Sequence, residues 1–195
     1  MEILKFPEAD TPYELRAQVL EIQDQAWPPA QPRRERDGTA THDPRLRPLS
    51  LLAVERGGVV VAALDILRKE LVHDGVAYAA GGLSTVATRK ESRGRGYGRR
   101  LVVAARTVMA AELGLDIGLF TCDRELQSFY ESAGWEVVDG AVVVGGTEDD
   151  PFPSDQPGFD KVTMAGSFTA AGERAREAFR GRRIELCPGT VDRLW

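Results

Sequence analysis

The stretch that decides the fold is Arg93-Gly94-Arg95-Gly96-Tyr97-Gly98-Arg99-Arg100, which stands between two apolar segments. Residues 78–86 before it have the composition of a strand, and residues 101–113 after it show helical spacing of apolar side chains. A strand, a glycine-rich loop and a helix start form an anion site in this order, because unpaired N–H groups and the helix dipole both favour negative oxygens. Glycine also lets the backbone approach a ligand closely. With its arginines, the loop predicts a pyrophosphate ligand.

The spacing of the loop excludes two familiar phosphate-binding motifs. A Walker loop ends in Gly-Lys-Ser/Thr, whereas two arginines follow Gly98. A dinucleotide fingerprint needs G-x-G-x-x-G, whereas Gly94, Gly96 and Gly98 are separated by single residues. We therefore disfavour a nicotinamide-dependent enzyme. The loop sequence by itself is also compatible with a glycine-rich turn that only ends a strand and binds no ligand.

Two segments carry a resemblance to a known family. Arg93, Gly96 and Gly98 make the pattern Arg-x-x-Gly-x-Gly, which resembles the acetyl-CoA pyrophosphate loop of the GCN5-related N-acetyltransferases (GNAT). Residues 129–135, Phe-Tyr-Glu-Ser-Ala-Gly-Trp, resemble the Tyr-x-x-x-Gly-Phe/Trp segment of the same family and follow in the family's order. The resemblance implies an α/β (α+β) fold in which helices flank a mixed, mostly antiparallel sheet that splays at the acetyl-CoA site. We expect residues 1–195 to form one such domain.

The same resemblance implies which residues meet acetyl-CoA. The backbone of Val86 and Thr88 would hold pantetheine, and the Val86 N–H would polarise the thioester carbonyl. Tyr130 would protonate the leaving thiolate; the alternative for Tyr130 is a core aromatic. The pyrophosphate would contact the loop residues Arg93, Gly94, Arg95, Gly96, Tyr97, Gly98 and Arg99.

A narrower resemblance points to the acceptor. Residues 86–94 are similar to the Val-Ala-Val-Arg-x-Asp/Glu-x-Arg-Gly stretch of the aminoglycoside 2′-N-acetyltransferases, and residues 192–195 resemble their Asp-Val-Trp ending with one residue added. This implies that Asp192 and the Trp195 carboxylate hold substrate ammonium groups. Asp65, an unusual carboxylate inside a strand, and Ser84 are further candidates for acceptor binding. We expect a primary amine of a small cationic molecule, such as an aminoglycoside; a protein or peptide amine and other small amines are the alternatives.

The family's strand carboxylate is missing from this sequence. Many relatives place a Glu there as general base, whereas Leu83-Ser84-Thr85 offers none. A water chain ending at Asp65 or at another acid could replace it, or the amine could arrive neutral. The same departure leaves open a CoA-binding module without activity. Cys122 is an alternative nucleophile, although direct transfer needs none and a structural cysteine is the simpler interpretation.

The composition limits the class of protein, its partners and its location. The 195 residues carry a net charge of −5 and 43% hydrophobic side chains, which suits a globular domain and argues against nucleic acid as a partner. The two cysteines lack metal-ligand spacing, no metal site is expected, and a reduced, cytoplasmic protein is indicated. Apolar runs are too short for a membrane span, and no signal peptide is evident at the N-terminus. Monomer and homodimer both stay open.

The rest of the chain alternates strands and helices. Asp10 or Thr11 should cap a first helix that has Pro12 at its first position. The polar segment 30–48 contains His42 and Asp43, which we interpret as part of a solvated loop rather than as substrate contacts. Residues 140–158 form an acidic segment rich in Gly and Pro. The expected strands cover residues 2–6, 49–54, 59–71, 76–88, 116–122, 135–138, 161–164 and 182–186, and further helices cover 123–133 and 169–179.

Overall fold

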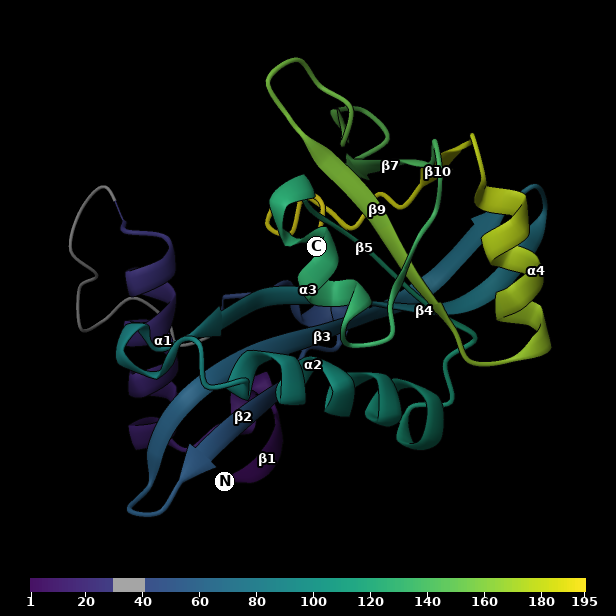
Figure 1. Ribbon diagram of the computed structural model, residues 1–195. Coiled ribbons are helices and arrows are strands. Elements are labelled where there is room, and N and C mark those ends of the chain that lie inside the picture. The colour runs from purple at the N-terminus through teal and green to yellow at the C-terminus, as the bar shows by residue number, and fades with distance from the viewer. Residues whose placement is uncertain (30–40) are drawn as a thin grey trace.

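The computed structural model describes residues 1–29 and 41–195, and its centre is a seven-stranded sheet with helices on both faces (Figure 1). All neighbouring strands in this sheet run antiparallel except β4 and β5. The predicted mixed, mostly antiparallel sheet is confirmed. In spatial order the strands are β1 (Glu2–Pro7), β2 (Leu49–Glu55), β3 (Val59–His73), β4 (Val76–Thr88), β5 (Ile117–Asp123), β9 (Lys161–Ser167) and β6 (Glu136–Val137).

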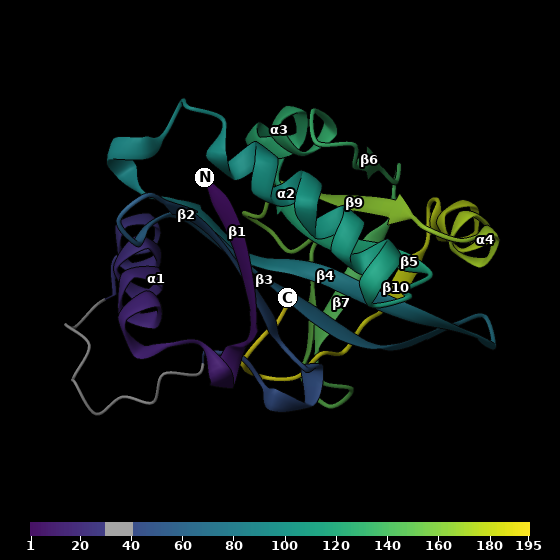
Figure 2. The same cartoon turned by 90° about the horizontal axis from the view of Figure 1, so that it is seen from below.

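Two hydrophobic clusters form because successive side chains of a strand point to opposite faces. Helix α1 (Tyr13–Ala26) covers one face, and its Val19 and Ile22 pack against Leu52, Val60 and other strand residues. Helix α2 (Tyr97–Thr107) covers the opposite face and runs along β3 and β4, as Figure 2 shows. Its buried side chains join the larger cluster. The glycine-rich loop at the start of α2 is thereby fixed to the sheet.

The start of α1 differs from the prediction. Pro12 is the N-cap in an extended conformation, with φ −52° and ψ 138°, so the first helical residue is Tyr13. A short 3-10 turn, Glu8–Asp10, precedes it. No side chain of the described residues caps this helix, so the expected cap by Asp10 or Thr11, with Pro12 as the first helical residue, was wrong.

The elements after the loop follow the predicted order. Helix α2 continues into a π-helical turn, Val108–Glu112. The single helix expected over 123–133 is a 3-10 turn, Arg124–Leu126, followed by α3 (Gln127–Glu131). Gly134, with φ +87°, ends this segment as predicted. The last helix, α4 (Ala170–Phe179), is capped by Thr169, whose side chain accepts a hydrogen bond from the Gly172 N–H.

A second sheet lies beside the first. It has the order β10 (Arg183–Glu185), β7 (Val142–Gly146) and β8 (Pro151–Pro153), so most of the acidic segment 140–158 is built around a strand pair. The strand expected over 182–186 is confirmed as β10. None of the helices in the described ranges is both long and apolar enough to span a membrane.

The C-terminal residues return to the middle of the molecule, where the C-terminus is marked in Figure 1. The Gly146 N–H donates to the Arg193 carbonyl at 2.8 Å, and the Trp195 indole N–H donates to the Leu119 carbonyl at 2.8 Å. Glycines make room for this path, since a Cβ at Gly145 would lie 1.6 Å from the Arg193 oxygen. The tail is therefore seated in the fold and is not a free end.

Replacing Gly82 with Ala should unseat the tail. The new Cβ would lie 2.4 Å from the Trp195 Nε1 and 2.7 Å from the Leu119 oxygen, and overpacking of this kind costs about 1–3 kcal/mol. Urea unfolding of Gly82→Ala, Trp195→Ala and the double variant should show coupling, because part of the clash disappears with the indole. Purely additive changes in unfolding free energy would contradict this packing.

Candidate active site

The glycine-rich loop has the geometry of an anion site. Gly96 is the N-cap of α2 in the left-handed region, with φ +79°, and the first helical bond runs from the Arg100 N–H to its carbonyl at 3.1 Å. The N–H groups of the preceding first-turn residues have no acceptor within the helix. Gly98 must stay small, because a Cβ there would lie 2.7 Å from the Thr88 Oγ1. A pocket of about 300 Å³ opens here, lined by Thr88, Ser92, Arg93, Gly94, Gly96, Tyr97, Gly98, Arg99 and Phe129.

Side chains around the loop are held by specific contacts. Arg93 Nε donates to the Thr88 carbonyl at 3.2 Å, and Arg99 Nε donates to the Ser132 carbonyl at 2.9 Å. The Tyr97 hydroxyl donates to the Glu55 carboxylate, and this bond raises the pKa of Tyr97. Free helical N–H groups, glycines and arginines together suit the pyrophosphate of CoA.

Strands β4 and β5 separate close to this loop. They pair only at Ala80 with Ile117 and at Gly81 with Gly118. Beyond these pairs a groove of about 250 Å³ brings the predicted pantetheine and acid residues together. It is lined by Ala26, Val86, Ala87, Thr88, Arg93, Leu126, Phe129 and Tyr130.

A β-bulge in β4 marks the edge of the groove. Its register with β3 passes from Ala87 opposite Ala63 to Ser84 opposite Asp65, so two residues of β4 face one of β3. Thr85 has φ +48°, which is rare for a β-branched residue. Backbone strain of this kind concentrates at functional sites, and here it turns the Thr85 hydroxyl onto Asp65.

Tyr130 retains its proton at ordinary pH. Its ring packs edge-on against Phe120 and Phe129, and burial, together with nearby Cys122, raises the pKa of its phenol well above the usual range. Burial also raises the pKa of Cys122 to about 11, so this thiol is neutral and a poor nucleophile. The interpretation of Cys122 as structural fits this environment.

A buried cluster of polar side chains lies on the face of the sheet opposite α2. Asp65 accepts hydrogen bonds from the Ser50 hydroxyl, from the Thr85 hydroxyl at 2.7 Å and from His42 Nε2 at 3.2 Å. The other ring nitrogen, His42 Nδ1, lies 2.5 Å from an oxygen of Asp192. The cluster thus joins three neighbouring strands, the segment before β2 and the C-terminal tail.

The expected solvated loop at His42 was wrong. His42 is 6% exposed, and the Asp43 N–H donates to the second oxygen of Asp192 at 2.9 Å. The sequence already marked Asp65 as a candidate site residue, because a carboxylate inside a strand is unusual. No local pattern could pair His42 with Asp192, because 150 positions separate them.

The cluster is negatively charged overall at neutral pH. Burial works against a charged His42, but hydrogen bonds to Asp192 and Asp65 outweigh it and raise its pKa to about 10. For Asp65, burial is likewise outweighed by the bonds from His42, Ser50 and Thr85, which lower its pKa. One imidazolium between two carboxylates leaves one net negative charge, and neither His42 nor Asp65 is poised to accept a proton near neutral pH.

The charge on His42 should make stability depend on pH. Its pKa is raised on folding from the ordinary 6.5 to about 10, so its contribution is complete below pH 6.5 and declines as pH rises through 10. His42→Gln should therefore lower the unfolding free energy by about 3 kcal/mol or more at pH 6.5, and the deficit should shrink toward pH 10. Urea titrations between pH 6 and 10 measure this. A deficit that grows with pH would contradict a protonated His42.

Two other residues predicted to bind the acceptor, Ser84 and Trp195, lie on or against strand β4. Ser84 is opposite Asp65 in the register and half-buried, and the Trp195 side chain is buried at the point where β4 and β5 part. In the acidic segment, Asp150 is paired with Arg193 at 2.7 Å and Asp155 with Arg183 at 3.1 Å. Within the described ranges, no group of His, Cys, Asp and Glu side chains could hold a metal ion.

Comparison with known proteins places this geometry in context. A family model described as an acetyltransferase (GNAT) domain matches residues 13–138. A search of curated protein sequences found no significant match.

Solved structures share the fold at low sequence identity. An acyl-CoA N-acyltransferase from Pseudomonas aeruginosa is 19% identical with a TM-score of 0.55, covering 85% of this chain and 99% of its own. An aminoglycoside 6′-N-acetyltransferase complexed with coenzyme A is 15% identical with a TM-score of 0.58, covering 87% and 98%. The ribosomal-protein-S18-alanine N-acetyltransferase from Escherichia coli is 16% identical with a TM-score of 0.52, covering 88% and 97%.

Proposed function

Since this chain belongs to the GNAT acetyltransferase family and is an N-acetyltransferase that uses acetyl-CoA, we propose that its acceptor is a primary amine of a small cationic molecule. An aminoglycoside is the leading example, in keeping with the resemblance of residues 86–94 to the 2′-N-acetyltransferases. The observation that carries the proposal is the net negative cluster of His42, Asp65 and Asp192 beside the β4 bulge.

The cluster attracts the substrate ammonium through its electrostatic field and not through direct hydrogen bonds. Both carboxylates already accept hydrogen bonds from protein donors and are buried, so a substrate ammonium gains from their charge without replacing these bonds. Glu148 and Asp149 are exposed on the loop between β7 and β8 and add to the negative charge of the chain. Such a field raises the local concentration of a cationic acceptor, and salt should weaken it.

Different residues of the groove and the loop have different roles in acetyl transfer. Acetyl-CoA supplies the activated acetyl group. The Val86 N–H, at the bulge, stabilises negative charge on the thioester oxygen, and the neutral phenol of Tyr130 protonates the leaving thiolate. The backbone of Val86 and Thr88 holds pantetheine, and the loop from Arg93 to Arg99 holds the pyrophosphate.

The acceptor amine reacts in its neutral form. Asp65 is a weak base because three donors stabilise its charge, and His42 is already protonated. The amine therefore loses its proton to water before attack. The rate at low acceptor concentration should rise with pH until the amine's own pKa is reached.

An amine panel tests the proposed acceptor. Thiol release from acetyl-CoA is measured with 2′-amino aminoglycosides, linear polyamines, a neutral-bodied monoamine and a peptide N-terminus. We expect the polycations to have the lowest KM, and Asp192→Asn to raise that KM about tenfold by removing one charge while calorimetric CoA binding is unchanged. Asp10→Asn, on the exposed turn before α1, is the matched control. Preference for the neutral amine or the peptide would overturn the acceptor proposal and leave the acetyltransferase activity intact.

A further inference from the structure

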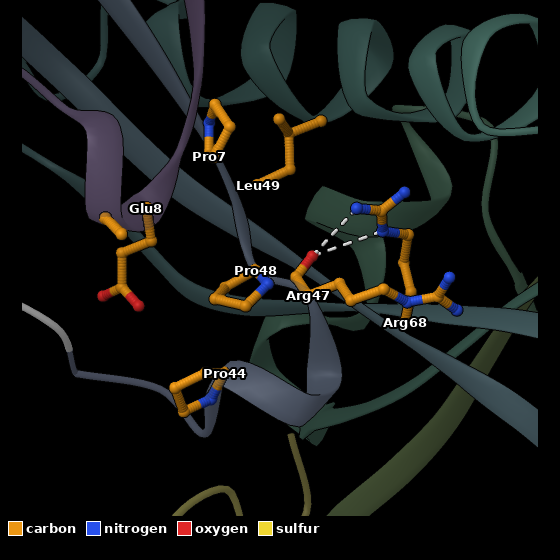
Figure 3. Close-up of a pocket in the computed structure, with 8 residues that line it drawn as sticks. Pro7, Glu8, Pro44, Arg47, Pro48, Leu49 and Arg68 are labelled. Atoms are coloured by element: carbon orange, nitrogen blue, oxygen red, sulfur yellow. Dashed lines mark hydrogen bonds between the residues drawn. The ribbon is translucent and has the colours of Figure 1, made fainter.

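A separate pocket of about 240 Å³ lies where β1 ends and β2 begins (Figure 3). One part of its wall is apolar and includes three prolines, and two arginines form another part. None of the acetyl-transfer roles assigned above falls on its residues. The lining consists of Pro7, Glu8, Ala9, Pro44, Arg47, Pro48, Leu49 and Arg68.

Arg68 presents an unused edge of its guanidinium. Its Nε and Nη2 donate to the Arg47 carbonyl oxygen at 3.2 and 3.1 Å, as the dashed lines in Figure 3 show. A guanidinium has five N–H donors, so the edge formed by Nη1 and the second Nη2 hydrogen is left over. No carboxylate among the described residues forms an ion pair with Arg68 or Arg47.

The one acid in the lining is engaged elsewhere. The Glu8 carboxylate accepts from Arg16 Nη2 at 2.6 Å and from the N–H and hydroxyl of Thr41 at 2.7 and 2.9 Å. Figure 3 shows it pointing away from the two arginines. The positive charge of the pocket is therefore not compensated by its own lining.

The backbone holds Arg68 in position. Arg47 has φ +47°, and its N–H donates to the Pro44 carbonyl at 3.0 Å, so a tight turn directs its carbonyl to Arg68. A residue other than glycine in this conformation is uncommon and often marks a functional position. Burial and the neighbouring Arg47 lower the pKa of Arg68, which means that a nearby anion would relieve an unfavourable environment.

We propose that this pocket binds a small organic carboxylate with a compact apolar body. The carboxylate pairs with the free edge of Arg68 in the bidentate geometry that guanidinium and carboxylate share, and Arg47 adds a second positive charge. The apolar body packs against Pro44, Pro48 and Leu49. The site is independent of the acetyl-transfer proposal.

Hexanoate is the probe. Hexylamine, a cation, and 1-hexanol, which is neutral, have the same six-carbon chain and serve as controls for charge. Titrations of the full chain without CoA are followed by amide NMR shifts. Hexanoate should shift the amide signals of Arg45, Leu46, Arg47, Leu49 and Arg68 saturably, with a Kd at least tenfold lower than that of hexylamine or 1-hexanol. Arg68→Gln should raise this Kd at least tenfold, Arg68→Lys should recover only part of the loss, and Arg56→Gln in the β2–β3 turn should change nothing.

Other results would overturn the site. Equal binding of 1-hexanol would show an apolar pocket without charge recognition, and equal binding of inorganic sulfate would show an adventitious ion only. Displacement of hexanoate by CoA would place the shifts at the CoA loop instead. If Arg68→Gln perturbs folding, judged by its NMR spectrum, Arg47→Gln tests the same charge, and unchanged hexanoate affinity in that variant counts against the proposal.

Discussion

Replacing Tyr130 with Phe should lower kcat by about 10²–10⁴-fold, the usual contribution of a general acid. The phenol is buried against Phe120 and Phe129, and its raised pKa keeps it protonated. The substitution keeps the ring packing and removes only the proton that the thiolate would take. Steady-state thiol release measures kcat, and calorimetry should show CoA binding close to that of the wild type.

Tyr78→Phe is the matched control for this result. Tyr78 is also 6% exposed, but it packs against Phe179 at the end of α4 and lies outside the groove. Its loss of a hydroxyl should leave kcat unchanged. If Tyr130→Phe retained full kcat across the pH range, water or another group would have to protonate the thiolate.

Replacing Gly98 with Asp should weaken CoA binding by at least about 100-fold. The Cβ alone would lie 2.7 Å from the Thr88 Oγ1. The carboxylate would also place a negative charge next to the pyrophosphate, and two like charges about 4 Å apart near a protein surface repel by about 4 kcal/mol. Calorimetric titration with CoA measures the effect directly. Gly96→Asp should act similarly, because it adds the same charge and because Gly96, unlike Gly98, has a left-handed backbone with φ +79°.

Two variants separate charge and shape in this loop. Gly98→Ala introduces only the steric conflict and should give a smaller loss. Gly75→Asp adds the same charge in the exposed turn between β3 and β4, where a Cβ meets no atom within 4 Å, and should leave CoA affinity unchanged. Normal CoA affinity in Gly98→Asp would refute the assignment of the loop.

The residues proposed for acceptor binding come from more parts of the chain than those proposed for acetyl-CoA binding. The proposed pyrophosphate loop is one continuous segment that follows a single strand. The cluster proposed for acceptor binding draws on His42, on three neighbouring strands and on the C-terminal tail. Changes in the tail should therefore affect stability, as predicted for Gly82→Ala and Trp195→Ala, and also the acceptor KM, as predicted for Asp192→Asn.

The sequence by itself determined the elements that carry the proposed acetyl-CoA site. Periodicity and turn residues predicted the strand, loop and helix around Arg93–Arg100, because such signals act over a few neighbouring residues. The same local rules predicted the hairpins of β2, β3 and β4 and the segment that carries Tyr130. The paired motifs then indicated the family, which the match over residues 13–138 confirms.

Only the tertiary structure brought together the buried cluster of His42, Asp65 and Asp192. His42 lies in a polar segment, and its hydration could not be distinguished from burial until Asp65 and Asp192 came within hydrogen-bond distance. The bulge at Thr85 and the seat of Trp195 likewise depend on strand register and on glycines at contact points. Propensity is local, whereas the pairing of a buried imidazolium with two carboxylates depends on contacts between residues up to 150 positions apart.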